Sequence, residues 1–182
     1  GATVLRAQGV GLSQGAFEQG VKNGTVVGHI GFPESMHLIG ATLGWNIDRI
    51  EQTREPIVAE VRRETASLVV EPGQVAGCRH TARAYRGDEA LITFDHPQLI
   101  QPQLEGIQTE DRIEIHGVPD VRLSSSPEIA GGPATAAIAV NMIPRVLSAP
   151  PGLKTMAELP VPSALAADVR QFVTHPRHRT DD

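Results

Sequence analysis

A short segment near the start of the chain carries apolar residues at helical spacing. Residues 16–22 lie between Ser13, a side chain that caps helix N-termini well, and Asn23-Gly24, a pair that favours a helix end. The preceding residues 3–8 are mixed in character, and their pattern allows an edge strand. We therefore expect one short helix, preceded by a segment without a clear period.

Apolar residues return at helical spacing further along. Met36, Ile39 and Leu43 recur at that spacing. Pro33 suits the first helical turn, where its missing N–H leaves no bond unmade, and Gly44 follows the last apolar residue. A second helix is expected between Pro33 and Gly44.

The middle of the chain consists of extended segments separated by turn residues. Residues 47–60 predict a long strand, and a proline within it indicates an edge position or a bulge. Residues 66–70 predict another strand. Residues 74–85 and 90–95 predict a pair of strands joined by the hairpin signal Arg86-Gly87-Asp88-Glu89.

Residues 96–152 mix loops, strands and one long helix. The glutamines and prolines of residues 96–109 indicate a loop, and residues 112–116 and 121–123 predict two further strands. The alanine-rich residues 134–143 predict a helix. Pro144, which lacks the N–H for the bond to residue 140, should kink this helix or end its regular hydrogen bonding, and residues 149–152 should terminate it. Helices grouped apart from hairpin-linked strands indicate an α+β fold rather than a doubly wound sheet.

The end of the chain has a weaker pattern. Residues 163–173 allow a short helix, and the polar residues 174–182 are expected to be mobile.

Composition narrows the class of partner. The 182 residues include 21 acidic and 16 basic side chains, a net charge of −5, and only 3% are aromatic, which argues against nucleic acid. No apolar stretch approaches the ~20 residues of a membrane helix, and the first residues lack a signal-peptide core. The single cysteine, Cys78, excludes an internal disulfide and is interpreted as a small buried residue. We therefore expect no membrane partner and a cytoplasmic location.

Common nucleotide and metal motifs are not found. Gly9-Val10-Gly11 is not followed by the third glycine of a dinucleotide fingerprint. The histidines His29 and His37, and His175 and His178 in the polar tail, have no carboxylate or cysteine at ligand spacing. No metal site is expected.

Residues 28–36, Gly-His-Ile-Gly-Phe-Pro-Glu-Ser-Met, form the most suggestive segment. Its two glycines allow a close backbone approach, and a helix N-terminus with free N–H groups follows. Phe32 and Met36 can form an apolar wall there. A ligand pocket and a tight packing corner between strand and helix both fit this pattern.

Two other polar features have simpler interpretations. Asn141 lies among apolar residues and must be hydrogen-bonded, either to backbone or to a ligand or partner subunit. Glu51, Arg54 and Glu55 are interpreted as a solvated strand face.

Several of these segments, in this order, carry a family resemblance. They are Gly28–Met36 with Leu43-Gly44-Trp45, Glu51-Gln52-Thr53-Arg54-Glu55-Pro56, Gly73-Gln74-Val75-Ala76-Gly77 with Thr81-Ala82-Arg83, Ala134–Ala137 through Asn141–Leu147, and Ala149-Pro150-Pro151-Gly152-Leu153. Together they resemble the C-terminal domain of the 2,4-diaminopentanoate dehydrogenase family, which includes the native amine dehydrogenases and is related to dihydrodipicolinate reductase. The resemblance covers roughly residues 8–162.

The resemblance implies a two-domain NAD(P)-dependent oxidoreductase that transfers hydride at an amine-bearing carbon through an imine. The N-terminal Rossmann domain, which would bind NAD or NADP and carry the catalytic glutamate, is absent from this sequence. Residues 1–162 would form an α+β substrate-binding and oligomerisation domain, with a mixed or largely antiparallel open sheet and helices packed on one face. Residues 163–182 would be a partly disordered extension. This chain alone is expected to be inactive and to bind no cofactor.

The resemblance also implies which residues line the substrate. The positions that match its pocket motifs are Ile30, Phe32, Pro33, Met36, Thr135 and Asn141. No catalytic residue is assigned, and His80 receives no role. The expected partners are a small amine or carbonyl substrate, the chain's own Rossmann domain and a second copy in a homodimer. The alternative is a stand-alone module that binds a small ligand or self-associates without catalysis.

Overall fold

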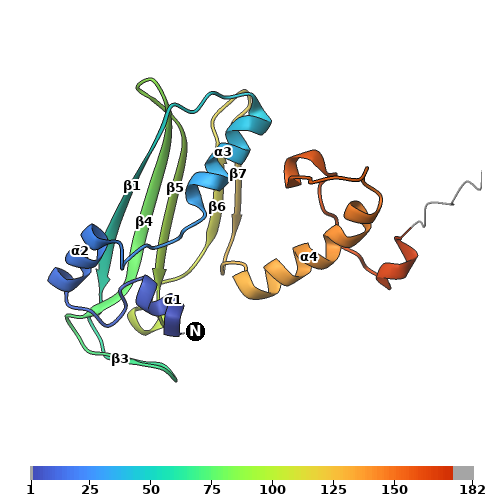
Figure 1. Cartoon of the computed structure of the whole chain (residues 1–182). Coiled ribbons are helices and arrows are strands. Elements are labelled where there is room, and N and C mark those ends of the chain that lie inside the picture. Colours follow the sequence, from blue (N-terminus) through green and yellow to red (C-terminus); the bar gives the residue numbers. More distant parts are fainter. Residues whose placement is uncertain (1, 174–182) are drawn as a thin grey trace, which may run out of the picture. The chain divides into compact units, whose positions relative to one another are not determined.

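The computed structural model describes residues 2–173 (Figure 1). It divides into two compact units, one ending at Gln108 and the other beginning at Thr109. The element order of helices, strands and one long helix, with only antiparallel strand pairs in the described residues, confirms an α+β fold with open antiparallel sheets.

Three helices open the first unit: α1 (Ala2–Ala7), α2 (Gln14–Asn23) and α3 (Phe32–Leu43). The predictions for α2 and α3 are confirmed, including the Ser13 cap and the left-handed glycines at positions 24 and 44. The allowance for an edge strand over residues 3–8 was wrong. That segment is helical because Leu5 packs against the core, a tertiary contact that the local pattern does not contain.

The main sheet has three antiparallel strands in the order β1-β4-β5. These strands are β1 (Arg49–Val58), β4 (Val75–Arg86) and β5 (Glu89–Leu99), and a smaller ribbon pairs β2 (Arg63–Glu64) with β3 (Val69–Val70). The predicted hairpin joins β4 to β5. Pro56 lies on an edge strand, and the register shifts just after it, as its sequence position predicted.

The predicted loop over residues 96–109 begins too early. β5 continues to Leu99, and His96 pairs with His80 of β4. Pro97 is tolerated because β5 is an edge strand of this sheet. The rest of that segment contains the 3-10 turn η1 (Pro102–Glu105).

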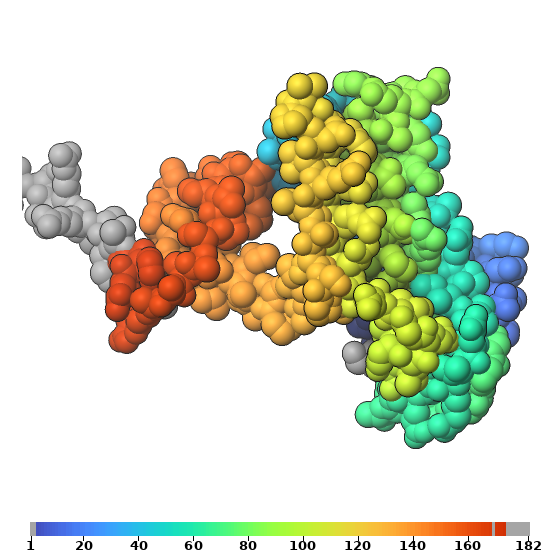
Figure 2. All heavy atoms as spheres, turned by 180° about the vertical axis from the view of Figure 1, so that it is seen from behind, coloured from blue at the N-terminus to red at the C-terminus, as the bar shows by residue number. Residues whose placement is uncertain are grey.

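Helices α2 and α3 cover one face of the sheet (Figure 1). Seen from the opposite side, atoms of the strands lie in front and α3 is largely hidden, while α2 shows at the edge (Figure 2). Phe17 of α2 packs on Cys78, while Phe32 and Met36 of α3 pack on Ala82 and Ala84. The helix-side face therefore carries the core.

The second unit contains the hairpin of β6 (Asp111–Ile115) and β7 (Val121–Ser125), followed by α4 (Gly131–Leu147) and two 3-10 turns, η2 (Met156–Glu158) and η3 (Val169–Gln171). The helix does not end at Pro144, because Ser148 N–H still donates to the Pro144 carbonyl at 3.1 Å. The short helix allowed over 163–173 is reduced to η3. The expectation for residues 174–182 lies outside the described residues. The boundary expected after residue 162 stays a prediction.

Candidate functional site

A glycine lies against the helix-side face of the sheet just before α3. Gly28 has φ +66°, and a Cβ built on it would lie 2.8 Å from His80 Nδ1. Both the left-handed backbone and this close approach require glycine. Gly28 therefore allows the loop before α3 to lie directly against the sheet.

Two side chains from the sheet hold this loop. Arg54 Nε donates to the Val27 carbonyl at 2.7 Å, and the His29 backbone N–H donates to His80 Nδ1 at 3.0 Å. The interpretation of Arg54 as part of a solvated face with Glu51 and Glu55 was wrong. Side chains alternate along β1, so the two glutamates are exposed on one face while Arg54 is half-buried on the other.

His80 is the central polar group on this face. Its side chain is buried, and its Nε2 lies 2.9 Å from Gln52 Oε1. Burial lowers the pKa of His80 to about 4, with further lowering by the positive charge of Arg54 and by His29 and His96. His80 is therefore neutral at physiological pH.

Aromatic rings stack at the start of α3. The Phe32 ring lies between the rings of His29 and His80, at centroid distances of 4.8 and 4.6 Å, and the Phe94 ring meets it edge-on at 5.2 Å. Phe32 is only 7% exposed. The side chains of Phe32 and Met36 thus form a packing corner, the second of the two arrangements that the sequence allowed.

Four of the six predicted substrate-side residues occupy this corner. Phe32 and Met36 are buried and Pro33 is half-buried, whereas Ile30 is 74% exposed. Of these side chains, that of Ile30 is the most accessible to a ligand. Substrate contact by all four stays a prediction.

The other two predicted residues lie on α4 in the second unit. Thr135 is exposed and its hydroxyl donates to the Gly131 carbonyl at 2.8 Å. Asn141 Oδ1 accepts the Leu165 backbone N–H at 3.3 Å, so a backbone group is the partner of this side-chain oxygen. Their contact with a substrate likewise stays a prediction.

The sequence reasoning missed Gln52, Arg54 and His80 as the polar framework of the corner. One signal was available, because side chains alternate along a strand, and His80 therefore falls on the same face of the strand as Cys78 and Ala82. A histidine among small buried residues must find hydrogen-bond partners. The partners themselves come from distant segments and could not be identified locally.

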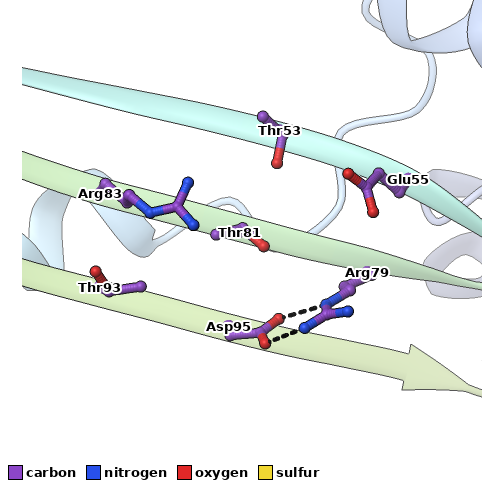
Figure 3. A pocket seen from close by; sticks show the side chains of 7 residues that line it. All are labelled: Thr53, Glu55, Arg79, Thr81, Arg83, Thr93 and Asp95. Carbon is purple, nitrogen blue, oxygen red and sulfur yellow. Dashed lines mark hydrogen bonds and ion pairs between the residues drawn. The ribbon is translucent and has the colours of Figure 1, made fainter.

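The opposite, open face of the sheet carries a separate shallow groove (Figure 3). Its volume is about 300 Å³, and its lining consists of Thr53, Glu55, Arg79, Thr81, Arg83, Thr93 and Asp95. Arg79 makes two hydrogen bonds to Asp95, at 2.8 and 2.5 Å, and this guanidinium holds the pKa of the carboxyl below its ordinary value. The lining includes none of the predicted residues and no apolar wall of the kind that small-molecule sites use. We therefore take the α3 corner as the candidate site.

The described residues do not fit a dinucleotide cradle. Such cradles need parallel strands connected through a helix, and every strand pair between residues 2 and 173 is antiparallel. The same part of the chain has no group of three or more histidine, cysteine or acidic side chains placed to hold a metal ion. Nor does it contain a helix long and apolar enough to cross a membrane.

A family model and a curated relative identify the same family for this chain. Residues 1–175 match the model of the 2,4-diaminopentanoate dehydrogenase C-terminal domain. A 2,4-diaminopentanoate dehydrogenase of Acetoanaerobium sticklandii is 42% identical over 175 residues, which are 96% of this chain and 50% of that protein. The chain thus spans about half the length of the curated relative it matches.

A solved structure shares the fold. The amine dehydrogenase of Mycobacterium smegmatis superposes with a TM-score of 0.71 over 87% of this chain and 46% of that chain, at 23% identity. With the family match over nearly the whole length, the conclusion is that this chain belongs to the 2,4-diaminopentanoate dehydrogenase C-terminal domain family.

Proposed function

We propose that this chain is the substrate-binding and subunit-contact domain of an NAD(P)-dependent oxidoreductase that acts at the amine-bearing carbon of a small molecule. The observation that carries the proposal is the 42% identity over 96% of the chain to a protein named for its action on 2,4-diaminopentanoate. The substrate class is a small amine or the corresponding carbonyl compound.

The corner before α3 supports a substrate-side role. Its loop is fixed from beneath by Arg54 and His80, while Ile30 and His29 are exposed. A fixed backbone that presents one apolar side chain and one imidazole suits a small ligand with apolar and polar parts. These residues bind and orient, and they carry out no chemical step themselves.

The remaining machinery would come from other parts of the complete protein. NAD or NADP would supply the redox chemistry and bind to a Rossmann domain of the same protein, since the described residues do not form such a site.

The alanine-rich α4 supports a homodimer. The lone buried thiol of Cys78 fits a location in the cytoplasm.

The proposal is tested with the protein expressed from its complete reading frame. We expect it to reduce NAD+ or NADP+ with 2,4-diaminopentanoate or a simpler amine, and to be inactive with the matching alcohol at the same concentration. Activity with the alcohol alone, or binding of the amine without reduction of either nucleotide, would contradict the proposal.

A further inference from the structure

We propose that His80 is a positioning residue for the substrate-side loop, and that its Nδ1 lone pair fixes the backbone from which His29 and Ile30 are presented. This inference rests on the proposed function in one respect, the identification of that loop as substrate-side. The anchoring itself is a property of the fold and can be measured without activity.

The loop is attached to the rest of the unit through a short series of backbone contacts. The N–H groups of Val27 and Gly28 donate to the Ala7 carbonyl, at 2.9 and 3.2 Å, and the Val27 carbonyl accepts from Arg54. The bond from His29 N–H to His80 Nδ1 is the next attachment along the chain. After it the backbone passes through the exposed Ile30 to the start of α3.

The hydrogen-bond partners determine which nitrogen of His80 carries the proton. Arg54 Nη2 donates to Gln52 Oε1 at 3.2 Å, so the atom that Gln52 presents here is its oxygen. The same oxygen faces His80 Nε2, which must therefore be the donor. Nδ1 is left as an acceptor, and a backbone N–H is the partner that it has.

Burial, and then the neighbouring charged and titratable groups, keep the His80 ring neutral near neutral pH. The groups that face His80 are Arg54 from β1, His29 from the loop and His96 from β5, and each of them disfavours a second proton on the ring. Protonation of Nδ1 would remove the acceptor and place two donors against each other. The anchor therefore depends on a neutral imidazole.

Two variants separate the anchor from the rest of the side chain. His80→Asn can place a carbonyl oxygen near the position of Nδ1, whereas His80→Gln reaches toward Gln52 and removes the acceptor for His29 N–H. Both variants lose the ring that stacks on Phe32, so they differ only in which polar contact they keep, the one to His29 N–H or the one to Gln52. Each would be made in the protein from the complete reading frame.

The first measurement is amide hydrogen exchange at His29, which needs no substrate. We expect His80→Gln to lower the protection of this amide about tenfold relative to His80→Asn. The second is steady-state kinetics, in which His80→Gln should raise the KM for the amine about fivefold to tenfold, with kcat little changed. His80→Asn should recover most of that loss.

The outcomes distinguish a failure of the His80 contact from a failure of the proposed function. Equal exchange at His29 in both variants, or an equal rise in the KM of both, would overturn the role of His80. Altered exchange with unaltered KM would show that His80 anchors a loop that the substrate does not use, and this also overturns the positioning role. If the wild-type protein turned over no amine, the proposed function would be wrong. The hydrogen bond from His29 N–H to His80 would still be tested independently, because equal exchange in the two variants would refute it.

Discussion

Gly28 lies closer to the sheet than any other residue type allows, and this makes it the most sensitive residue of the corner. A methyl group there would both occupy a left-handed backbone conformation and meet His80 Nδ1 at 2.8 Å. Gly24 provides a matched control, because it has φ +76° but no neighbour within 4 Å of the added Cβ.

We expect Gly28→Ala to lower the free energy of unfolding by about 3 kcal/mol, because it combines backbone strain with a clash against a buried ring. Gly24→Ala should lose only about 1 kcal/mol, for the backbone strain alone. Urea unfolding of both variants tests this. Equal losses would show that the approach to His80 is not tight.

His80 should also make the stability of the fold depend on pH. Its pKa is about 4 in the folded chain and near 6.5 when unfolded, so the unfolded chain takes up the proton first as the pH falls. The stabilisation is complete above pH 6.5 and is lost between pH 6.5 and 4. The loss is at most about 3 kcal/mol.

The comparison of wild type with His80→Asn isolates this effect, since every carboxylate titrates in both proteins. We expect the stability advantage of the wild type to shrink as the pH is lowered from 7 to 4 in urea titrations. A constant difference across that range would mean that the buried ring takes up its proton as readily as an exposed one.

At the scale of elements, β2 and η1 are joined by a buried guanidinium. The Arg63 side chain is fully buried; its Nη1 donates to the carbonyls of Ile100 and Gln101, and its Nη2 lies 2.6 Å from Glu105. Hydrogen bonding by the backbone N–H of Glu60, and then by Arg63, holds the pKa of Glu105 below its ordinary value. These contacts hold residues 100–105, near the end of the first unit, against β2.

Arg63→Met should therefore destabilise the unit by about 3 to 5 kcal/mol, because it removes the positive charge that pairs with the Glu105 carboxylate and the donor of two carbonyls. The adjacent Arg62 provides the control. Its side chain is 52% exposed and pairs with surface glutamates, so Arg62→Met should leave the unfolding midpoint almost unchanged. Similar midpoints for the two variants would show that the buried arginine contributes little.

Local signals predicted most elements, and long-range contacts explain the misses. Neighbouring residues are enough to predict the Ser13 cap, the helix ends at Gly24 and Gly44, and the β4–β5 hairpin. The helix at residues 2–7 and the extension of β5 to Leu99 depend on packing and pairing with distant segments.

The same distinction applies to the candidate site. The loop before α3 was evident from its glycines. The roles of Arg54 and His80 were not, because each contacts that loop across more than 25 residues, with sequence separations of 27 and 51.

At the scale of the whole molecule, the proposed association between copies can be tested on α4. Its apolar side chains Ile138, Val140, Ile143 and Val146 are 41–57% exposed. Exposed apolar surface of this kind marks an interaction site. We expect sedimentation velocity of the complete protein to show a dimer at micromolar concentration, with a shift toward monomer in Ile143→Glu. A monomer at high micromolar concentration would refute self-association.

The most direct test of the account compares the Michaelis constants of the complete protein for the amine and for the nucleotide with those of its Ile30→Ala variant. Leu43→Ala is the control, because Leu43 is also an exposed apolar side chain (55%, against 74% for Ile30). If this chain provides the substrate side and the nucleotide binds elsewhere, Ile30→Ala will raise the KM for the amine severalfold and leave the KM for NAD(P)+ unchanged, and Leu43→Ala will alter neither. A change confined to the nucleotide KM, or an amine KM that is the same in all three proteins, would contradict the account.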